Sequence, residues 1–383
     1  MSQNTFSHII DFIHSLYPGE DPVPLHAPRF IGNERKYVVE TIDSTFVSSV
    51  GKYVDRFEEM ICENTGAKYA VAVVNGTCAL HIALHMAGVR PGDEVITQPL
   101  SFVATANSIA HCGAKPIFLD VDRDTMGLDP IALKNFLQAH TRVKEDICYN
   151  KITGKRITAC IPMHTFGHPC KIDEIAAICD RYHIVLIEDA AESVGSVYKG
   201  QHTGTFGLFG VYSFNGNKTV TCGGGGAIVT NDELLATRAK HVTTTAKLPH
   251  PYEYVHDMIG YNYRLPNINA ALACAQLEQL SNFIENKRNL AEMYGEFFGS
   301  LGIPFVREPM EARSNYWLNS IIMPDRNARD EFLKVTNEAG IMTRPAWRLL
   351  NKLEMYKDCQ NDALVTAQWL EDRLVNIPSS VRV

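Results

Sequence analysis

One lysine, Lys218, lies in a loop of small and polar residues and is followed by four consecutive glycines, Gly223 to Gly226. Ordering glycine costs conformational entropy, so such a run indicates backbone that approaches another group closely or takes positive φ. A lysine in this setting either contacts a phosphate or reacts through its amine. A P-loop requires glycine directly before the lysine and again five residues earlier, but Asn217 and Tyr212 occupy those positions. The loop is therefore not a P-loop; a surface lysine beside a flexible turn remains the alternative to a reactive amine.

The segment Asn75-Gly76-Thr77 lies between an apolar run and a helical pattern. Small residues at a helix N-terminus leave free N–H groups and the positive end of the helix dipole, which together favour a phosphate. The alternative is an ordinary helix cap by Asn75 or Thr77. Ser213, five residues before Lys218, would add a hydroxyl to such a site, or it is a plain turn serine.

A carboxyl and an aromatic ring are expected at the same edge of the sheet. Asp189 follows a continuous apolar strand, where a poorly solvated acid needs a cationic or hydrogen-bonding partner; a salt bridge or a helix cap is the alternative. Phe102 follows another strand and is placed to cover a flat ring, although a core phenylalanine has the same pattern. Ligands of open α/β sheets gather at the carboxyl ends of the strands. A lysine, an acid and a phosphate cradle at that edge match the needs of pyridoxal phosphate.

The elements that position these residues alternate between strands and helices from residue 69 to about residue 240. Apolar strands that alternate with helices predict a largely parallel sheet covered on both faces. The expected strands are 69–74, 95–97, 117–121, 157–162, 184–187 and 227–230, and the expected helices between them are 77–87, 102–112, 130–139 and 171–182.

Beyond residue 245 the pattern becomes mixed α+β. A long helical region at 267–301, with a possible break, precedes strands at 317–323 and 341–343 and a helix at 327–339. The predicted division is therefore an N-terminal arm with helices at 1–50, a large cofactor-binding domain at 51–244, and long helices with a small C-terminal α+β domain at 245–383.

Composition excludes several classes of protein. A net charge of −7 argues against a nucleic-acid or anionic-membrane partner. The chain lacks both a secretion signal and a run of eighteen apolar residues, so it is expected to be neither secreted nor membrane-spanning. Its ten cysteines form no C-x-x-C pair, which fits reduced thiols in a cytoplasmic enzyme better than disulfides or a zinc site. No metal is expected.

The order and spacing of these motifs resemble fold-type I pyridoxal-phosphate enzymes and, within them, the nucleotide-sugar aminotransferases. The resemblance covers nearly the whole chain. It implies an aspartate-aminotransferase-like α/β fold: a large domain around a mostly parallel sheet of the seven-stranded type, and a smaller α+β C-terminal domain. The motifs that carry it are VSS at 47–49, NGTCAL at 75–80, FVATAN at 102–107, EDAAES at 188–193, SFNGNK at 213–218, the glycines at 223–226 and GYNYR at 260–264.

The resemblance implies catalytic roles for two residues. Lys218 would hold pyridoxal 5'-phosphate covalently as a Schiff base, and Asp189 would pair with the pyridine nitrogen. Phe102 would stack on the ring, and Glu192 would lie near the ring hydroxyl, where many family members have Gln or His instead.

The remaining cofactor contacts are also implied by the resemblance. Gly76, Thr77 and Ser213 match the phosphate-binding positions. Asn262 matches a residue that reaches the phosphate from a neighbouring subunit, which implies a homodimer with shared active sites.

Further segments of the sequence bear on the substrate. Some family members have histidine in place of the lysine and dehydrate sugars, so Lys218 favours transamination. The segments 24–32, 43–49, 163–169, 315–319 and 343–347 resemble enzymes that make 4-amino-4,6-dideoxy sugars on UDP-N-acetylglucosamine derivatives, in bacillosamine- or legionaminic acid-type pathways for surface glycans. Ser48, Arg344 and Trp347 are the candidates for binding the UDP end, although Arg344 and Trp347 could equally be structural.

This resemblance predicts transfer of the amino group of L-glutamate to C4 of a UDP-linked 4-keto-6-deoxy N-acetylhexosamine. The product would be a UDP-2-acetamido-4-amino-2,4,6-trideoxy sugar. The alternatives are action at C3 or on a dTDP- or GDP-linked sugar, sugar dehydration, and a nucleotide-binding module without activity.

Overall fold

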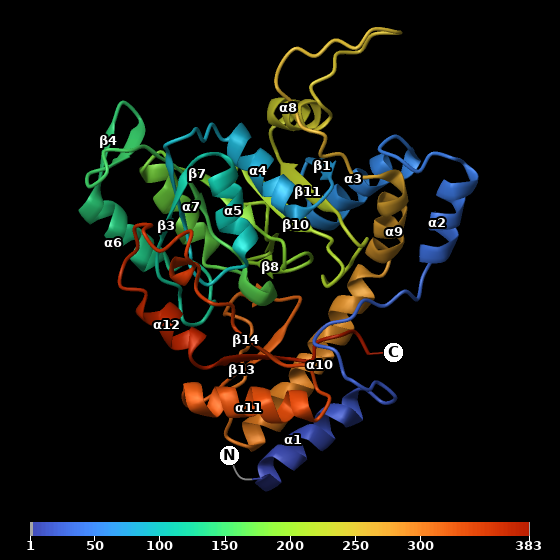
Figure 1. Cartoon of the computed structure of the whole chain (residues 1–383), viewed down its shortest axis with the longest axis vertical. Helices are drawn as coiled ribbons and strands as arrows, with labels where there is room; N and C mark the ends of the chain where they lie inside the picture. Colours follow the sequence, from blue (N-terminus) through green and yellow to red (C-terminus); the bar gives the residue numbers. More distant parts are fainter. Residues whose placement is uncertain (1–2, 383) are drawn as a thin grey trace.

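The computed structural model describes residues 3–382 and is built around one seven-stranded sheet (Figure 1). In order across the sheet, the strands are β1 (Tyr69–Val73), β11 (Gly226–Thr230), β10 (Phe209–Ser213), β7 (Val185–Asp189), β6 (Ile157–Ile161), β2 (Glu94–Thr97) and β3 (Lys115–Phe118). Neighbours from β10 to β3 run parallel, whereas β11 runs antiparallel to both β1 and β10. The predicted mostly parallel sheet is confirmed, with one antiparallel strand inside it.

Helices cover both faces of this sheet, as strands that are apolar on both sides require. One face packs against α4 (Gly76–Met86), α5 (Val103–His111) and α8 (Glu233–Thr243), and the other against α3 (Lys52–Thr65), α6 (Pro130–His140), α7 (Ile172–Arg181) and α9 (Asn267–Leu277). Strand side chains alternate between the two faces. In β1, Val71 and Val73 face α4 and α8, whereas Ala72 faces α3 and α9.

A smaller body lies beside the carboxyl ends of the parallel strands (Figure 1). It contains α1 (Gln3–Leu16), α10 (Leu280–Ser300), α11 (Arg326–Glu338) and a three-stranded sheet of β13 (Asn319–Ile322), β15 (Leu374–Ile377) and β14 (Arg344–Pro345). Ile9 and Ile13 of α1 belong to one apolar cluster with Phe298 of α10 and Phe332 of α11. The first helix of the predicted N-terminal arm thus packs with C-terminal elements, and the division at residues 50 and 244 stays a prediction.

The helical region after residue 267 contains the expected break, because α9 ends at Leu277 and α10 begins at Leu280. The strand predicted at 341–343 is wrong: Ile341 and Met342 pair with Val23 of the N-terminal arm, and the strand follows at 344–345. The other elements are α2 (Glu34–Asp43), α12 (Val365–Glu371), the hairpin β4 (Thr141–Lys144) and β5 (Ile147–Asn150), the short strands β8 (Val197–Tyr198), β9 (Gln201–His202) and β12 (Ala312–Arg313), and 3-10 turns at 165–167 and 350–352.

Candidate active site

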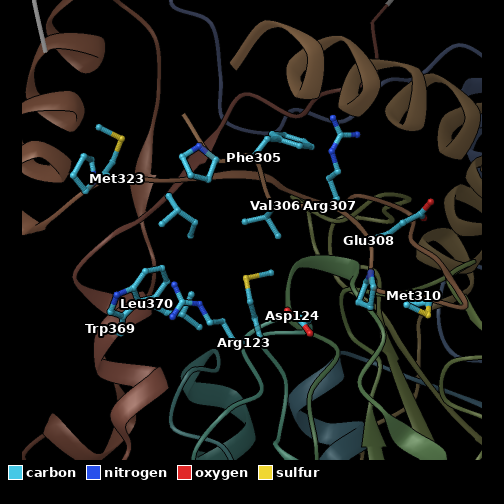
Figure 2. Close-up of a pocket in the computed structure, with 15 residues that line it drawn as sticks. Arg123, Asp124, Phe305, Val306, Arg307, Glu308, Met310, Met323, Trp369 and Leu370 are labelled. Atoms are coloured by element: carbon cyan, nitrogen blue, oxygen red, sulfur yellow. The ribbon is translucent and has the colours of Figure 1, made fainter. Parts of the chain in front are cut away.

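A cavity of about 380 Å³ opens where β7 and β10 end and α4 begins. Its volume lies in the range of sites that enclose small molecules. A larger cavity of about 710 Å³ lies elsewhere, among the segments 123–126, 304–310 and 322–324 (Figure 2). Within residues 3–382 the larger cavity contacts none of the predicted site residues, so the smaller one is the candidate active site. The predicted residues that line the smaller cavity are Gly76, Thr77, Phe102, Asp189, Glu192, Ser213, Lys218 and Trp347.

The start of α4 forms one end of this cavity. Asn75 caps the helix, since its side-chain oxygen accepts a hydrogen bond from the N–H of Cys78 at 2.8 Å. A Cβ at Gly76 would lie 3.0 Å from Cβ and 3.3 Å from Oγ of Ser213, so only glycine leaves room between the helix start and this hydroxyl. First-turn amides of a helix have no partners within the helix and attract anions. The amides and the Ser213 hydroxyl together fit a phosphate group.

The last of the four glycines after Lys218 supports the same end of the cavity. A Cβ at Gly226 would lie 2.6 Å from the carbonyl carbon of Asn75 and 2.9 Å from the amide nitrogen of Gly76. Gly226 therefore allows the start of β11 to pass directly beneath the start of α4. The two segments in this close contact, at Gly226 and at residues 75–76, belong to the same chain.

Asp189 lines the same cavity, at the end of β7, and is buried. Its Oδ2 accepts a hydrogen bond from the Thr105 hydroxyl at 2.7 Å, and its Oδ1 accepts one from the N–H of Ala191 at 3.2 Å. Burial raises the pKa of Asp189, and these hydrogen bonds and the charge of Lys218 offset this only in part. Such a carboxylate gains stability from a cation, and the protonated ring nitrogen of pyridoxal phosphate is one that fits here.

The Lys218 amine lies between a carboxylate and an aromatic ring. Its Nζ is 3.3 Å from Oε1 of Glu192 and 4.0 Å from the centroid of the Trp317 ring. Burial raises the pKa of Glu192 to about 7, against the opposing charge of Lys218. Oε2 of Glu192 accepts a hydrogen bond from the N–H of Phe166 at 2.9 Å. Glu192 can therefore exchange a proton near neutral pH beside the amine.

Aromatic rings form the mouth of the cavity. Phe102 is 52% exposed, which is unusual for a phenylalanine and leaves its face open to a ligand. Trp347 lies 6.5 Å from the Phe102 ring and 4.8 Å from the Phe166 ring, measured between centroids. Flat ligands and the apolar faces of sugars pack on such rings.

Three residues predicted from the sequence do not line this cavity within the chain. Arg344 is exposed and donates hydrogen bonds to Oδ1 of Asn337 at 2.8 Å and to the carbonyl of Thr343 at 2.7 Å. Ser48 lies on the loop after α2, Asn262 lies on the segment before α9, and both are exposed. A single chain therefore gives these three side chains no contact with the cavity.

Two side chains that contact Asp189 or Lys218 are absent from the site residues predicted from the sequence. Thr105 lies one turn after Phe102, inside the motif FVATAN at 102–107, but only the fold brings its hydroxyl to Asp189. Trp317 lies in the segment 315–319, which the sequence marked without a role, and it lines the cavity beside Lys218. Their positions within these motifs were the available signal.

Two structural features bear on the expected partners. Residues 3–382 include no group of three or more His, Cys, Asp or Glu side chains arranged to hold a metal ion. Within the same range no helix combines the length and apolar character needed to cross a membrane.

This fold and this cavity are those of a fold-type I pyridoxal-phosphate aminotransferase. Residues 29–383 match the DegT/DnrJ/EryC1/StrS aminotransferase family, and the chain belongs to this family. It is 38% identical over 357 residues to GDP-perosamine synthase of Escherichia coli O157:H7, covering 93% of each chain. It is also 38% identical over 333 residues to the putative pyridoxal phosphate-dependent aminotransferase EpsN of Bacillus subtilis (strain 168), covering 87% of this chain and 83% of that one.

A solved structure of the same family has the same fold. The crystal structure of a DegT DnrJ EryC1 StrS aminotransferase from Brucella abortus matches with a TM-score of 0.81 and 28% identity, over 91% of this chain and 90% of that one. The predicted family, fold class, enzyme class and use of pyridoxal phosphate are confirmed. The name of the Escherichia coli relative denotes a GDP-linked sugar, whereas the sequence markers favoured a UDP-linked one.

Proposed function

We propose that the protein transfers the amino group of L-glutamate to C4 of a nucleotide-linked 4-keto-6-deoxy sugar. One observation carries this proposal: the Lys218 amine and the Asp189 carboxyl line the same cavity as the start of α4. These groups supply an amine that can react, an acid for a ring nitrogen and donors for a phosphate. The same cavity supports placing pyridoxal phosphate there.

Each residue has a proposed part in the reaction. When bound, pyridoxal phosphate supplies an electron-accepting ring that stabilises negative charge on the carbon next to the transferred nitrogen. Lys218 is the base that moves a proton to and from that carbon. Asp189 keeps the ring nitrogen protonated, and Thr105 orients its carboxylate. Glu192 lies beside Lys218 and takes up or returns a proton near neutral pH.

The phosphate and the sugar are held by other groups. Gly76, Thr77 and Ser213 anchor the phosphate through two amides and a hydroxyl. Phe102 packs on the cofactor ring, and Trp347 offers its face to the sugar nucleotide at the cavity mouth. A 6-deoxy sugar suits an aromatic wall, because its methyl group needs no hydrogen-bond partner.

The nucleotide has two candidates. The sequence segments 24–32, 43–49 and 343–347 favour a UDP-linked 2-acetamido sugar. Its UDP end would meet Trp347, which lines the cavity, and Ser48 and Arg344, which lie outside the cavity of their own chain. The names of two relatives, the GDP-perosamine synthases of Escherichia coli O157:H7 and Vibrio cholerae, favour a GDP-linked sugar. For either nucleotide we propose that this protein takes a 4-keto-6-deoxy sugar as acceptor and that its product serves a surface glycan.

We infer a cytoplasmic homodimer in which Asn262 reaches the phosphate of the other subunit. The segment between α8 and α9 projects from the body of the chain (Figure 1). It carries Tyr252, Tyr254 and Ile259, which are 82%, 81% and 85% exposed. Exposed apolar side chains on a projecting arm support contact with a second copy. All ten cysteines are free, which supports a reducing compartment.

The decisive experiment incubates the purified protein with L-glutamate and a panel of UDP-, GDP- and dTDP-linked 4-keto-6-deoxy sugars. Mass spectrometry and NMR then identify the product and the carbon that carries the new amine. We expect a 4-amino sugar on one nucleotide, and no product from Lys218→Ala. A 3-amino sugar, or loss of the C3 hydroxyl, would assign the protein to the alternative activities. Absence of any product across the panel would contradict the proposal.

A further inference from the structure

Trp317 contacts the reactive amine of Lys218 inside the candidate active site. It is only 4% exposed, and its ring centroid lies 4.0 Å from Nζ of Lys218. An ammonium group over an aromatic face is attracted by the negative charge of the ring face, more strongly where water is excluded. The Lys218 side chain is 12% exposed, so little water competes for this contact.

The same indole holds the loop that carries the lysine. Nε1 of Trp317 donates a hydrogen bond to the carbonyl of Asn217 at 2.7 Å. Asn217 directly precedes Lys218, so ring and backbone contacts act on adjacent positions of one loop. A side chain from the smaller body thus fixes a loop of the larger one.

The backbone of Trp317 is fixed in turn by two buried side chains. Lys287 of α10 donates a hydrogen bond from Nζ to the carbonyl of Trp317 at 3.1 Å. Oδ1 of Asn315 accepts a hydrogen bond from the N–H of Trp317 at 2.8 Å, and its Nδ2 donates to the carbonyl of Glu192 at 2.9 Å. Lys287 and Asn315 are both fully buried. Asn315 therefore ties Trp317 to the segment that carries the other partner of Lys218.

We propose that Trp317 is a positioning residue for Lys218: its ring is the resting surface of the ammonium whenever the lysine is not bonded to the cofactor. This inference rests on the proposed role of Lys218. Transamination would release Lys218 from the cofactor. The free amine would then have to carry a proton and return to the cofactor carbon to which it was bonded before. A free four-carbon side chain has many rotamers, and a fixed ring that attracts its charged end restricts them. The Glu192 carboxylate attracts the charged end of Lys218, and the Trp317 ring restricts where that end can lie.

The first test measures how Lys218 reacts with pyridoxal phosphate. Cofactor-free protein is mixed with pyridoxal phosphate, quenched with borohydride at set times, and the fraction of modified Lys218 is read by peptide mass spectrometry. We expect Trp317→Leu to slow this reaction by roughly five- to thirtyfold, because the Lys218 side chain loses the ring that restricts its rotamers and its loop loses the hydrogen bond from Nε1 of Trp317. Trp317→Phe keeps a ring face and should slow it by only about two- to fivefold.

A matched control exists in the same chain. Trp369 also carries a cation on its ring, with the guanidinium carbon of Arg123 3.8 Å from the centroid, beside the larger cavity (Figure 2). Trp369→Phe makes the same chemical change away from the proposed site. We expect it to leave the rate of Lys218 modification and the turnover rate unchanged.

The second test separates this inference from a purely structural role. In Lys218→Ala protein, pyridoxal phosphate can bind only non-covalently, and its affinity is measured by fluorescence. If Trp317 acts through Lys218, adding Trp317→Leu should change that affinity by less than about twofold, and KM for glutamate in the single variant should stay close to wild type while kcat falls. The inference would be overturned if Trp317→Leu lowered the affinity for pyridoxal phosphate equally in wild-type and in Lys218→Ala protein. It would also be overturned if Trp317→Leu left the rate of Lys218 modification unchanged. Full turnover by Lys218→Ala would instead overturn the proposed function.

Discussion

Oε1 of Glu192 lies 3.3 Å from Nζ of Lys218, and both side chains line the candidate active site. Glu192 follows β7 and Lys218 follows β10, and these two strands are parallel neighbours in the sheet. Burial of the Glu192 carboxyl raises its pKa to about 7, although the nearby amine favours its charged form. The Glu192 carboxyl therefore changes its protonation near neutral pH, beside the amine of Lys218.

The first prediction concerns the pH dependence of stability. The pKa of Glu192 rises from 4.5 to about 7 on folding, so the folded chain binds this proton more tightly than the unfolded one. The contribution of Glu192 to the free energy of unfolding of the cofactor-free protein should therefore fall as pH rises from about 4.5 to about 7. Glu192→Gln removes this titration, so its stability relative to wild type should rise by about 3 kcal/mol across that window.

Urea unfolding at pH 5 and pH 8 measures this difference. Glu292→Gln, on the exposed side of α10, is the control and should follow wild type at both values. A constant offset between Glu192→Gln and wild type would show that Glu192 does not titrate in this window.

The second prediction concerns Asp189 and the hydroxyl that orients it. Asp189→Asn should lower kcat by about a hundredfold or more, because an amide does not stabilise a protonated ring nitrogen as a carboxylate does. Thr105→Val removes one hydrogen bond to Oδ2 of Asp189 and should lower kcat by about two- to tenfold. Steady-state kinetics with saturating glutamate measure both.

Thr105→Ser is the matched control, since it keeps the hydroxyl and should retain most of the wild-type rate. If Thr105→Ser and Thr105→Val lose activity equally, packing of the methyl group rather than the hydrogen bond explains the effect.

The third prediction concerns the phosphate end of the cavity. In Gly76→Ala the new Cβ would lie 3.0 Å from Cβ of Ser213, tighter than ordinary van der Waals contact. We expect the affinity for pyridoxal phosphate to fall by about tenfold or more, because Ser213 must shift from the phosphate cradle. Equilibrium dialysis with pyridoxal phosphate measures it. Gly299→Ala on α10, where a Cβ meets nothing within 4 Å, should leave the affinity unchanged.

The fourth prediction concerns the shared active site of the proposed homodimer. Lys218→Ala should be inactive, and Asn262→Ala should lose most activity through weaker phosphate binding. If Asn262 serves the neighbouring subunit, a mixed dimer of the two variants contains one intact site and one doubly altered site. Equal mixing after unfolding and refolding should then restore roughly a quarter of wild-type activity. No recovery, in a mixture shown to contain mixed dimers, would place Asn262 in its own subunit's site.

The local sequence pattern was enough to predict several strands and helices of this protein. The apolar run 184–187 predicted a buried strand ending near Asp189, and the structure has β7 at Val185–Asp189. The helical pattern after Asn75 predicted α4, and Asn75 caps it. Such signals are carried by neighbouring residues, because burial of a strand or of one helix face depends on a short repeat. The order of these elements then placed Lys218, Asp189 and Gly76 at one edge of a sheet.

Tertiary structure alone decided the partners of those residues. Thr105 and Asp189 are 84 positions apart, and no local pattern links a hydroxyl on α5 to a carboxylate at the end of β7. The position of β11 between β1 and β10 is likewise a matter of long-range pairing. Trp317 belongs to the smaller body, and its contact with Lys218 exists only because the two bodies pack together. A sequence shows which side chains are able to do chemistry, but their distances depend on contacts between residues far apart in the chain.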